Sequence, residues 1–180
     1  MTRDAVIARA HAYFDDADGY WADLARRVAI PTECQKPERL PVLYQYLEEE
    51  MRPCFEAIGY TCRVYDNPME GMGPALLATR IEDKNLPTIL GYGHGDVVRG
   101  HEGRWAEDRD PWKLTRDGDK VYGRGTADNK GQHSVHMGAL KSVIEERGHL
   151  GFNSKFIIET GEENGSWGLN DMVALHKDDF

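Results

Sequence analysis

The chain has 180 residues, of which 40% are hydrophobic and 29% charged, and its formal net charge is −9. A chain of this length can form one domain with a real core, because it buries roughly 70% of its unfolded surface. The acidic balance argues against nucleic acid or an anionic membrane surface as a partner, because phosphate binding needs clustered Lys and Arg.

The cysteine usage and the N-terminal sequence predict a cytoplasmic protein. There are three cysteines and no C-x-x-C pair, so neither a disulfide framework nor a cysteine zinc site is expected. The N-terminal stretch lacks the apolar core and cleavage site of a signal peptide, and no stretch has the length of a transmembrane helix. Any bound metal should therefore use His and carboxylate ligands.

The first third of the sequence predicts helices with structural roles. The spacing of apolar residues indicates helices over 4–16 and 18–28, followed by a longer helix over about 38–58. Pro53 conflicts with the interior of this last helix and could kink or shorten it. Gly59 is a natural terminator. We expect these helices to support the fold rather than to take part in chemistry.

Strands are predicted next, over 60–65 and 75–81, and then an apolar strand over 88–92 that we expect to be buried and central. This third strand leads into the sequence Gly93-His94-Gly95-Asp96, whose glycines allow a sharp turn and a close approach. A His with a nearby carboxylate suits a metal site, because one ring nitrogen binds the metal and the other donates its proton to the carboxylate. The alternative is a turn His that is hydrogen-bonded to a loop Asp.

A second cluster is the glycine-rich stretch 123–131, which precedes a helix predicted over 132–147 and follows a surface loop with a hairpin at 117–119. Its spacing matches neither G-x-G-x-x-G nor the P-loop, so nucleotide binding is not expected. Asp128 lies among small residues before the helix, where its carboxylate could bind two metal ions, one through each oxygen. The alternative is that Asp128 is a helix cap. His101, in the loop, is not expected to be a ligand.

The third cluster follows a strand predicted over 154–160, and a helix predicted over about 169–177 comes after it. It contains the adjacent carboxylates Glu162 and Glu163. Neighbouring carboxylates disfavour each other's ionisation. A metal resolves this conflict if one glutamate binds it and the other takes a proton from water. The alternative is an exposed pair of surface glutamates.

The order of these elements predicts an α/β fold, with a mixed, mostly parallel sheet and helices on both faces. Three strand ends then offer one imidazole and several carboxylates without sulfur. This donor set suits divalent metals, zinc first, with cobalt and manganese as alternatives. An incomplete sheet edge could also pair with a second copy of the chain, so a homo-oligomer is an open alternative.

The three clusters resemble the signatures of a known family. They read GHGDVV, GRGTADNKG and TGEENGSWGL, and they are similar to those of the dizinc metallopeptidases that include acetylornithine deacetylase, succinyl-diaminopimelate desuccinylase, aminoacylase and carnosinase. The resemblance covers essentially the whole chain. It implies two divalent metal ions and hydrolysis of an amide bond next to a free carboxylate, in a dipeptide or an N-acyl amino acid. The second and third motifs are closer to the dipeptidases than to the deacetylases.

The resemblance also implies a role for each site residue. The implied metal ligands are His94, Asp128 and Glu163. Asp128 bridges the two ions, and its peptide bond to Asn129 is cis in this family. Asp96 orients the imidazole, and Glu162 is the general base that activates water and then protonates the leaving amine.

The family pattern contains further parts that these 180 residues lack. These are a strand that ends in a metal-binding carboxylate, a lid or dimerisation domain, and two histidines. No other histidine here occupies those positions, although His133 is close enough to be a nearby polar contact. We therefore expect residues 1–180 to be the amino-terminal part of a hydrolase catalytic domain, one that binds metal weakly and hydrolyses little or nothing by itself because ligands are missing. The alternative is a complete, non-catalytic module that binds a metal or a partner.

Overall fold

The computed structural model describes residues 2–180, and none of the helices in that part is long and apolar enough to cross a membrane. The helices are α1 (Arg3–Asp15), α2 (Tyr20–Ala29), α3 (Leu40–Gln45), α4 (Arg52–Glu56), α5 (Lys130–Arg147) and α6 (Leu169–Leu175). The strands are β1 (Thr61–Tyr65), β2 (Ala75–Arg80), β3 (Thr88–His94), β4 (Thr115–Asp117), β5 (Lys120–Tyr122) and β6 (Asn153–Glu159). Shorter turns are the 3-10 segments η1 (Pro37–Arg39), η3 (Ala106–Asp108) and η4 (Glu162–Asn164), and the π-helical segment η2 (Tyr46–Met51).

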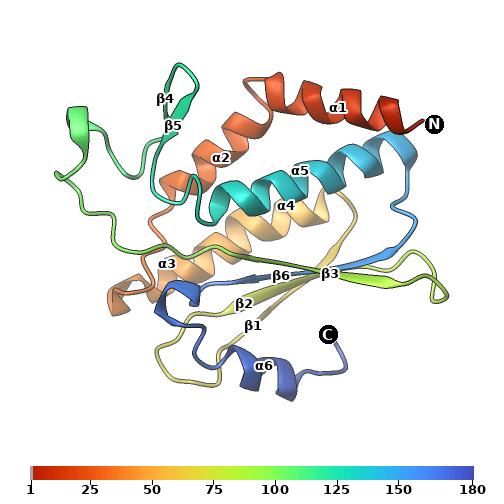
Figure 1. The fold of residues 1–180 in the computed structure, drawn as a ribbon. Coiled ribbons are helices and arrows are strands. Elements are labelled where there is room, and N and C mark those ends of the chain that lie inside the picture. Colours follow the sequence, from red (N-terminus) through yellow and green to blue (C-terminus); the bar gives the residue numbers. More distant parts are fainter. Residues whose placement is uncertain (1) are drawn as a thin grey trace.

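Four strands form the main sheet in the order β1–β2–β6–β3, and β4 and β5 form the predicted hairpin (Figure 1). β3 pairs with β6 in parallel, whereas the β1–β2 and β2–β6 pairs are antiparallel. The predicted α/β fold with a mixed sheet is therefore confirmed, but the expectation of a mostly parallel sheet is wrong for these strands. The connections explain the difference. The loop of residues 66–74 joins β1 to β2 as antiparallel neighbours, whereas β3 reaches β6 through a crossover that contains α5.

Helices cover both faces of the sheet, as predicted. Figure 1 shows α6 on one side and the other helices on the opposite side, with α1 and α2 lying outside α5. The larger core joins Tyr46 and Phe55 of the η2–α4 segment to Phe156 and Ile158 of β6. On the other face Met172 of α6 packs with apolar residues of β1, β2 and β6. Burial of both faces fixes β6, whose carboxyl end leads to Glu162 and Glu163.

The helix predicted over 38–58 is present, but its winding changes ahead of Pro53. Residues Tyr46–Met51 wind as a π-helical turn, and α4 resumes at Arg52. A proline inside a helix lacks the N–H donor, and its ring clashes with the carbonyl four residues earlier. A wider turn at this point relieves the clash, so the helix continues past the proline. Gly59, at φ +81°, lies just past the helical segment, as predicted.

β3 differs from the buried, central strand that the apolar sequence predicts. Within the described residues β6 is its one neighbour, so β3 lies at the edge of the sheet. Ile89, Leu90 and Tyr92 are accordingly 52%, 55% and 45% exposed. Composition cannot distinguish an edge strand from a central one, because the distinction depends on which strands pair with it. β3 also continues through His94, which lies beside Glu159 of β6.

Candidate metal centre

The three predicted clusters meet at one edge of the sheet. His94 is the last residue of β3, and Glu162 begins the η4 turn shortly after β6. Because β3 and β6 are parallel, their carboxyl ends lie at the same edge. Asp128 reaches this edge from the turn that precedes α5. The structure thus brings together residues from three separate parts of the chain.

The His94 imidazole lies at the centre of the cluster. Its Nδ1 is 3.3 Å from Oδ1 of Asp96 and 3.2 Å from the Asp96 backbone oxygen. Its Nε2 is 3.0 Å from Oδ1 of Asp128 and 3.8 Å from Oε2 of Glu162. The side chains of His94 and Asp96 are buried, whereas those of Asp128 and Glu162 are 70% and 44% exposed. The site therefore has a buried imidazole at its base and carboxylates at its open rim.

Asp96 connects the first cluster to the third. Its Oδ2 accepts the backbone N–H of Glu163 at 3.0 Å, which fixes the start of the η4 turn. Its Oδ1 is fully buried, faces His94, and has no hydrogen bond of good geometry in the described part of the chain. A buried carboxylate oxygen beside Nδ1 favours a proton on that nitrogen. The orienting role of Asp96 stays a prediction.

The electrostatics of the cluster favour a positive charge. Burial alone lowers the pKa of His94, but the nearby Asp96 carboxylate, together with Asp128 and Glu162, outweighs it and raises this pKa to about 9. The pKa of Glu163 is also raised, first by burial and then by the negative charge of Asp128. Four carboxylates around one imidazole thus hold excess negative charge that a cation can neutralise.

The donor set fits a divalent metal ion. Imidazole nitrogen with carboxylate oxygens is a ligand set that zinc accepts, and two ligands of one tetrahedral zinc ion lie about 3.3 Å apart. Nε2 of His94 and Oδ1 of Asp128 are 3.0 Å apart, close to that separation. In this conformation no three His, Cys, Asp or Glu side chains among those that the structure describes form a ready-made metal site. The ligand roles of His94, Asp128 and Glu163 therefore stay predictions.

The turn that carries Asp128 has the expected backbone. The peptide bond between Asp128 and Asn129 is cis, as the family resemblance implied. The N-cap of α5 is Asn129, and the Asp128 carboxylate instead contacts His94. The alternative that Asp128 is merely a helix cap is therefore wrong.

The sequence indicated His133 as a nearby polar contact, which the structure bears out, but sequence reasoning missed Asn129 and Tyr46, which also pack against the two glycines beside His94. The expected close approach is confirmed: His133 and Asn129 lie against Gly93, and the Tyr46 ring lies against Gly95. A Cβ atom on either glycine would collide with these side chains. No signal marked Tyr46, which occupies one position in an amphipathic helix. Asn129 could have been identified from its position, because it directly follows the predicted ligand Asp128 and carries a side chain that can form hydrogen bonds.

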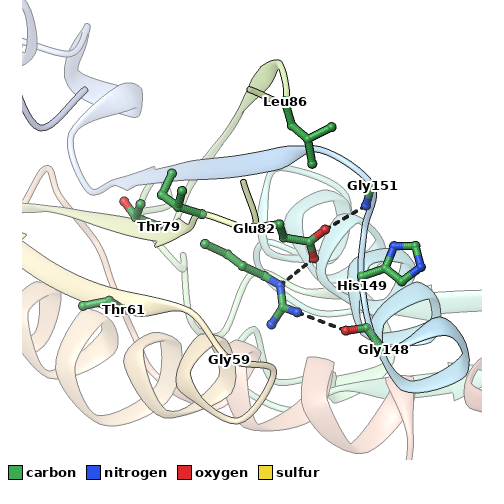
Figure 2. Close-up of a pocket in the computed structure, with 10 residues that line it drawn as sticks. Gly59, Thr61, Thr79, Glu82, Leu86, Gly148, His149 and Gly151 are labelled. Atoms are coloured by element: carbon green, nitrogen blue, oxygen red, sulfur yellow. Dashed lines mark hydrogen bonds and ion pairs between the residues drawn. The ribbon is translucent and has the colours of Figure 1, made fainter. Parts of the chain in front are cut away.

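A separate pocket lies at the opposite end of the sheet, and Figure 2 shows residues that line it. It contains Thr61 at the start of β1, Glu82 just after β2, and His149 just after α5. Because β6 begins at this end and finishes beside His94, the pocket is separate from the candidate metal centre. The two ends of the sheet can therefore be compared directly.

A mixed α/β fold that gathers an imidazole and four carboxylates at one sheet edge defines a candidate metal-dependent hydrolase. The model of Peptidase family M20/M25/M40 matches residues 90–180. The chain belongs to this family, and the resemblance seen in its three motifs is confirmed.

Individual relatives agree with this assignment. The Beta-Ala-His dipeptidase of Homo sapiens is 39% identical over 108 residues, which are 59% of this chain and 21% of that protein. The succinyl-diaminopimelate desuccinylase of Legionella pneumophila strain Corby is 31% identical over 163 residues, 86% of this chain and 37% of that protein. The structure of human carnosine dipeptidase 1 superimposes with a TM-score of 0.87 at 28% identity, covering 97% of this chain and 38% of that one. The chain thus spans less than half the length of each.

Proposed function

We propose that this site takes part in metal-dependent hydrolysis of an amide bond next to a free carboxylate. The proposed substrates are dipeptides or N-acyl amino acids, and the proposed cofactors are two divalent ions, zinc first. One observation carries the proposal: in a chain of family M20/M25/M40, the His94 imidazole lies between buried Asp96 and exposed Asp128. The names of the relatives, a dipeptidase and a desuccinylase, support the substrate class.

His94, Asp128 and Glu163 would hold the ions, and Asp128 is the proposed bridge between them. The bound ions would polarise the amide carbonyl and make water more acidic. Asp96 has the task of keeping the proton on Nδ1 of His94, which leaves the Nε2 lone pair available as a donor. The exposure of Asp128 lets its carboxylate face both the imidazole and the open rim.

Glu162 is the proposed general base. Its Oε2 is 3.8 Å from Nε2 of His94, so it lies beside the imidazole without a hydrogen bond to it. Its partial exposure gives water access to the carboxylate. A carboxylate in this position can take a proton from the attacking water and return it to the leaving amine. Glu163, its neighbour, is thereby left free to bind metal.

The test is hydrolysis by the 180-residue chain with and without zinc, cobalt or manganese, using β-alanyl-histidine, other dipeptides and N-acyl amino acids. We expect slow, metal-dependent turnover, because three predicted ligands in residues 2–180 serve two ions. Glu162→Gln keeps the side-chain size but removes the base, and should lower turnover roughly 10²- to 10⁴-fold while zinc binding persists. Turnover that needs no metal, or that is unchanged in Glu162→Gln, would contradict the proposal.

A further inference from the structure

A chain of hydrogen bonds that begins at two buried side chains, Tyr46 and His133, ends at the backbone of His94. The Tyr46 hydroxyl is 2.7 Å from Nε2 of His133, and Nδ1 of His133 is 3.1 Å from Oδ1 of Asn129. The same Asn129 oxygen accepts the backbone N–H of His94 at 3.2 Å. Tyr46 and His133 are both fully buried. Neither has a part in the hydrolysis proposed above.

The donors along this chain can be assigned without ambiguity. A backbone N–H can only donate, so the Asn129 atom that faces His94 must be the oxygen. Nδ1 of His133 faces the same oxygen and must therefore carry a proton. The ring of a neutral histidine then offers Nε2 as an acceptor for the Tyr46 hydroxyl.

The charges around His133 favour this neutral form. Burial lowers the pKa of His133 well below its usual value, and the positive charges of Arg27 and Lys130 lower it further. The Lys130 ammonium is itself buried, donates to the backbone oxygens of Arg27 and Ile30, and lies 5.0 Å from the centre of the Tyr46 ring. With one ring proton, His133 can donate to Asn129 and accept from Tyr46 at the same time.

Packing places the same side chains directly against the strand that ends at His94. His133 and Asn129 occupy the space that a side chain on Gly93 would fill. The Tyr46 ring does the same at Gly95, so His94 is held from both adjacent positions. Tyr46 begins the π-helical turn, a type of local distortion that often occurs at functional sites. The two glycines that flank His94 thus allow Tyr46 and His133 to pack closely against its backbone.

We propose that Tyr46 and His133 form a positioning pair for the metal centre. They orient Asn129, which binds the backbone of His94 and is joined directly to Asp128. Through this one side chain the pair fixes the spacing of two predicted ligands without touching metal or substrate. This inference rests on the proposed function, because the distance between His94 and Asp128 matters to the site only if both residues bind metal.

The first test is the zinc affinity of Tyr46→Phe, measured by competition with a chromophoric chelator. The variant keeps the ring against Gly95 and removes only the hydroxyl. We expect zinc to bind about 10-fold more weakly, the lower end of the effect of changing a residue that orients metal ligands. The absorption spectrum of the cobalt-loaded chain should also change. The matched control is Tyr60→Phe, because the Tyr60 hydroxyl is buried without a hydrogen-bond partner in the described part of the chain. It should bind zinc as the parent does.

The second test needs no metal. Long-range ¹H–¹⁵N correlation of the metal-free chain should show His133 neutral, with its proton on Nδ1, and Tyr46→Phe should disturb this tautomer. At position 133 itself, His133→Asn can still donate to Asn129, whereas His133→Val cannot. We therefore expect zinc affinity to fall in the order parent, His133→Asn, His133→Val. These variants decide the question if Tyr46→Phe does not fold.

The outcomes separate the two proposals. Zinc bound by the parent, lost in Asp128→Ala and as tight as in the parent in Tyr46→Phe or His133→Val would overturn the positioning pair alone. A proton on Nε2 of His133 would also overturn it. Absence of zinc binding in the parent, or binding that is unchanged in Asp128→Ala, would overturn the proposed function and the positioning pair together.

Discussion

The two ends of the sheet differ in how their charged side chains are paired. At the pocket end, the Glu82 carboxylate accepts the backbone N–H of Gly151 (Figure 2). It also accepts the backbone N–H of Leu150 and a guanidinium N–H of Arg80. At the other end, four carboxylates gather around one imidazole, and a buried oxygen of Asp96 has no hydrogen bond of good geometry in the described structure. A hollow whose charges are already paired has a structural explanation. The excess of negative charge around His94 is explained if this end of the sheet binds a cation.

Asn153 should give the largest change in stability, at the pocket end. It is 3% exposed, accepts the N–H groups of Glu82 and Asp83, and donates to the backbone oxygens of Asp83 and Leu86. Asn153→Ala leaves these groups without partners, so we expect a loss of about 3 kcal/mol in the free energy of unfolding. Urea denaturation measures it. A loss below about 0.5 kcal/mol would show that the hydrogen bonds of Asn153 do not stabilise the pocket end of the sheet.

Glu82→Gln should have a smaller effect that depends on pH. Burial alone would raise the pKa of Glu82, but hydrogen bonds from Leu150, Gly151 and Arg80 lower it overall. A pKa that is lower in the folded state stabilises the protein above the unfolded value and loses that effect as pH falls through the folded value. We therefore expect Glu82→Gln to cost about 1 kcal/mol at pH 7 and less at pH 3. Urea denaturation at both values measures this, with the exposed Glu70→Gln as control.

A Glu→Gln substitution at the metal centre, Glu163→Gln, should change the free energy of unfolding in the opposite direction and by the smallest amount. The pKa of Glu163 is raised by burial and by its negative neighbours, so its ionised form is disfavoured in the metal-free fold. Glu163→Gln should therefore stabilise the metal-free chain at pH 7, by about 0.5 kcal/mol or less because the site is open to solvent. Thermal unfolding in the presence of a chelator measures the shift. Destabilisation as large as that of Glu82→Gln would remove the contrast between the two ends.

Much of the site could be predicted because its residues lie in short local motifs. His94 and Asp96 are two positions apart, Glu162 and Glu163 are adjacent, and Asp128 precedes a helix that the sequence itself indicates. That the first and third motifs would meet followed from placing each at a strand end, because parallel strands bring their carboxyl ends together. Asp128 instead reaches them from the turn before α5.

The remaining features depend on contacts between distant residues, which local patterns do not encode. Apolar residues in β3 predict a strand, yet its place at the sheet edge depends on which strands pair with it. Tyr46 lies opposite His133 only because the π-helical turn and α5 pack against the two glycines on either side of His94. The cytoplasmic location, the oligomeric state and the assignment of residues 1–180 to the amino-terminal part of one catalytic domain stay predictions.

Equilibrium dialysis of the purified chain against zinc tests the central claim most directly, with Asp128→Ala, Glu163→Ala and Glu82→Gln measured alongside. The account predicts that the parent chain and Glu82→Gln bind zinc to the same extent, and that both substitutions at the metal centre abolish this binding. Equal zinc binding in all four proteins, or none in the parent, would show that the carboxylates around His94 do not form a metal centre.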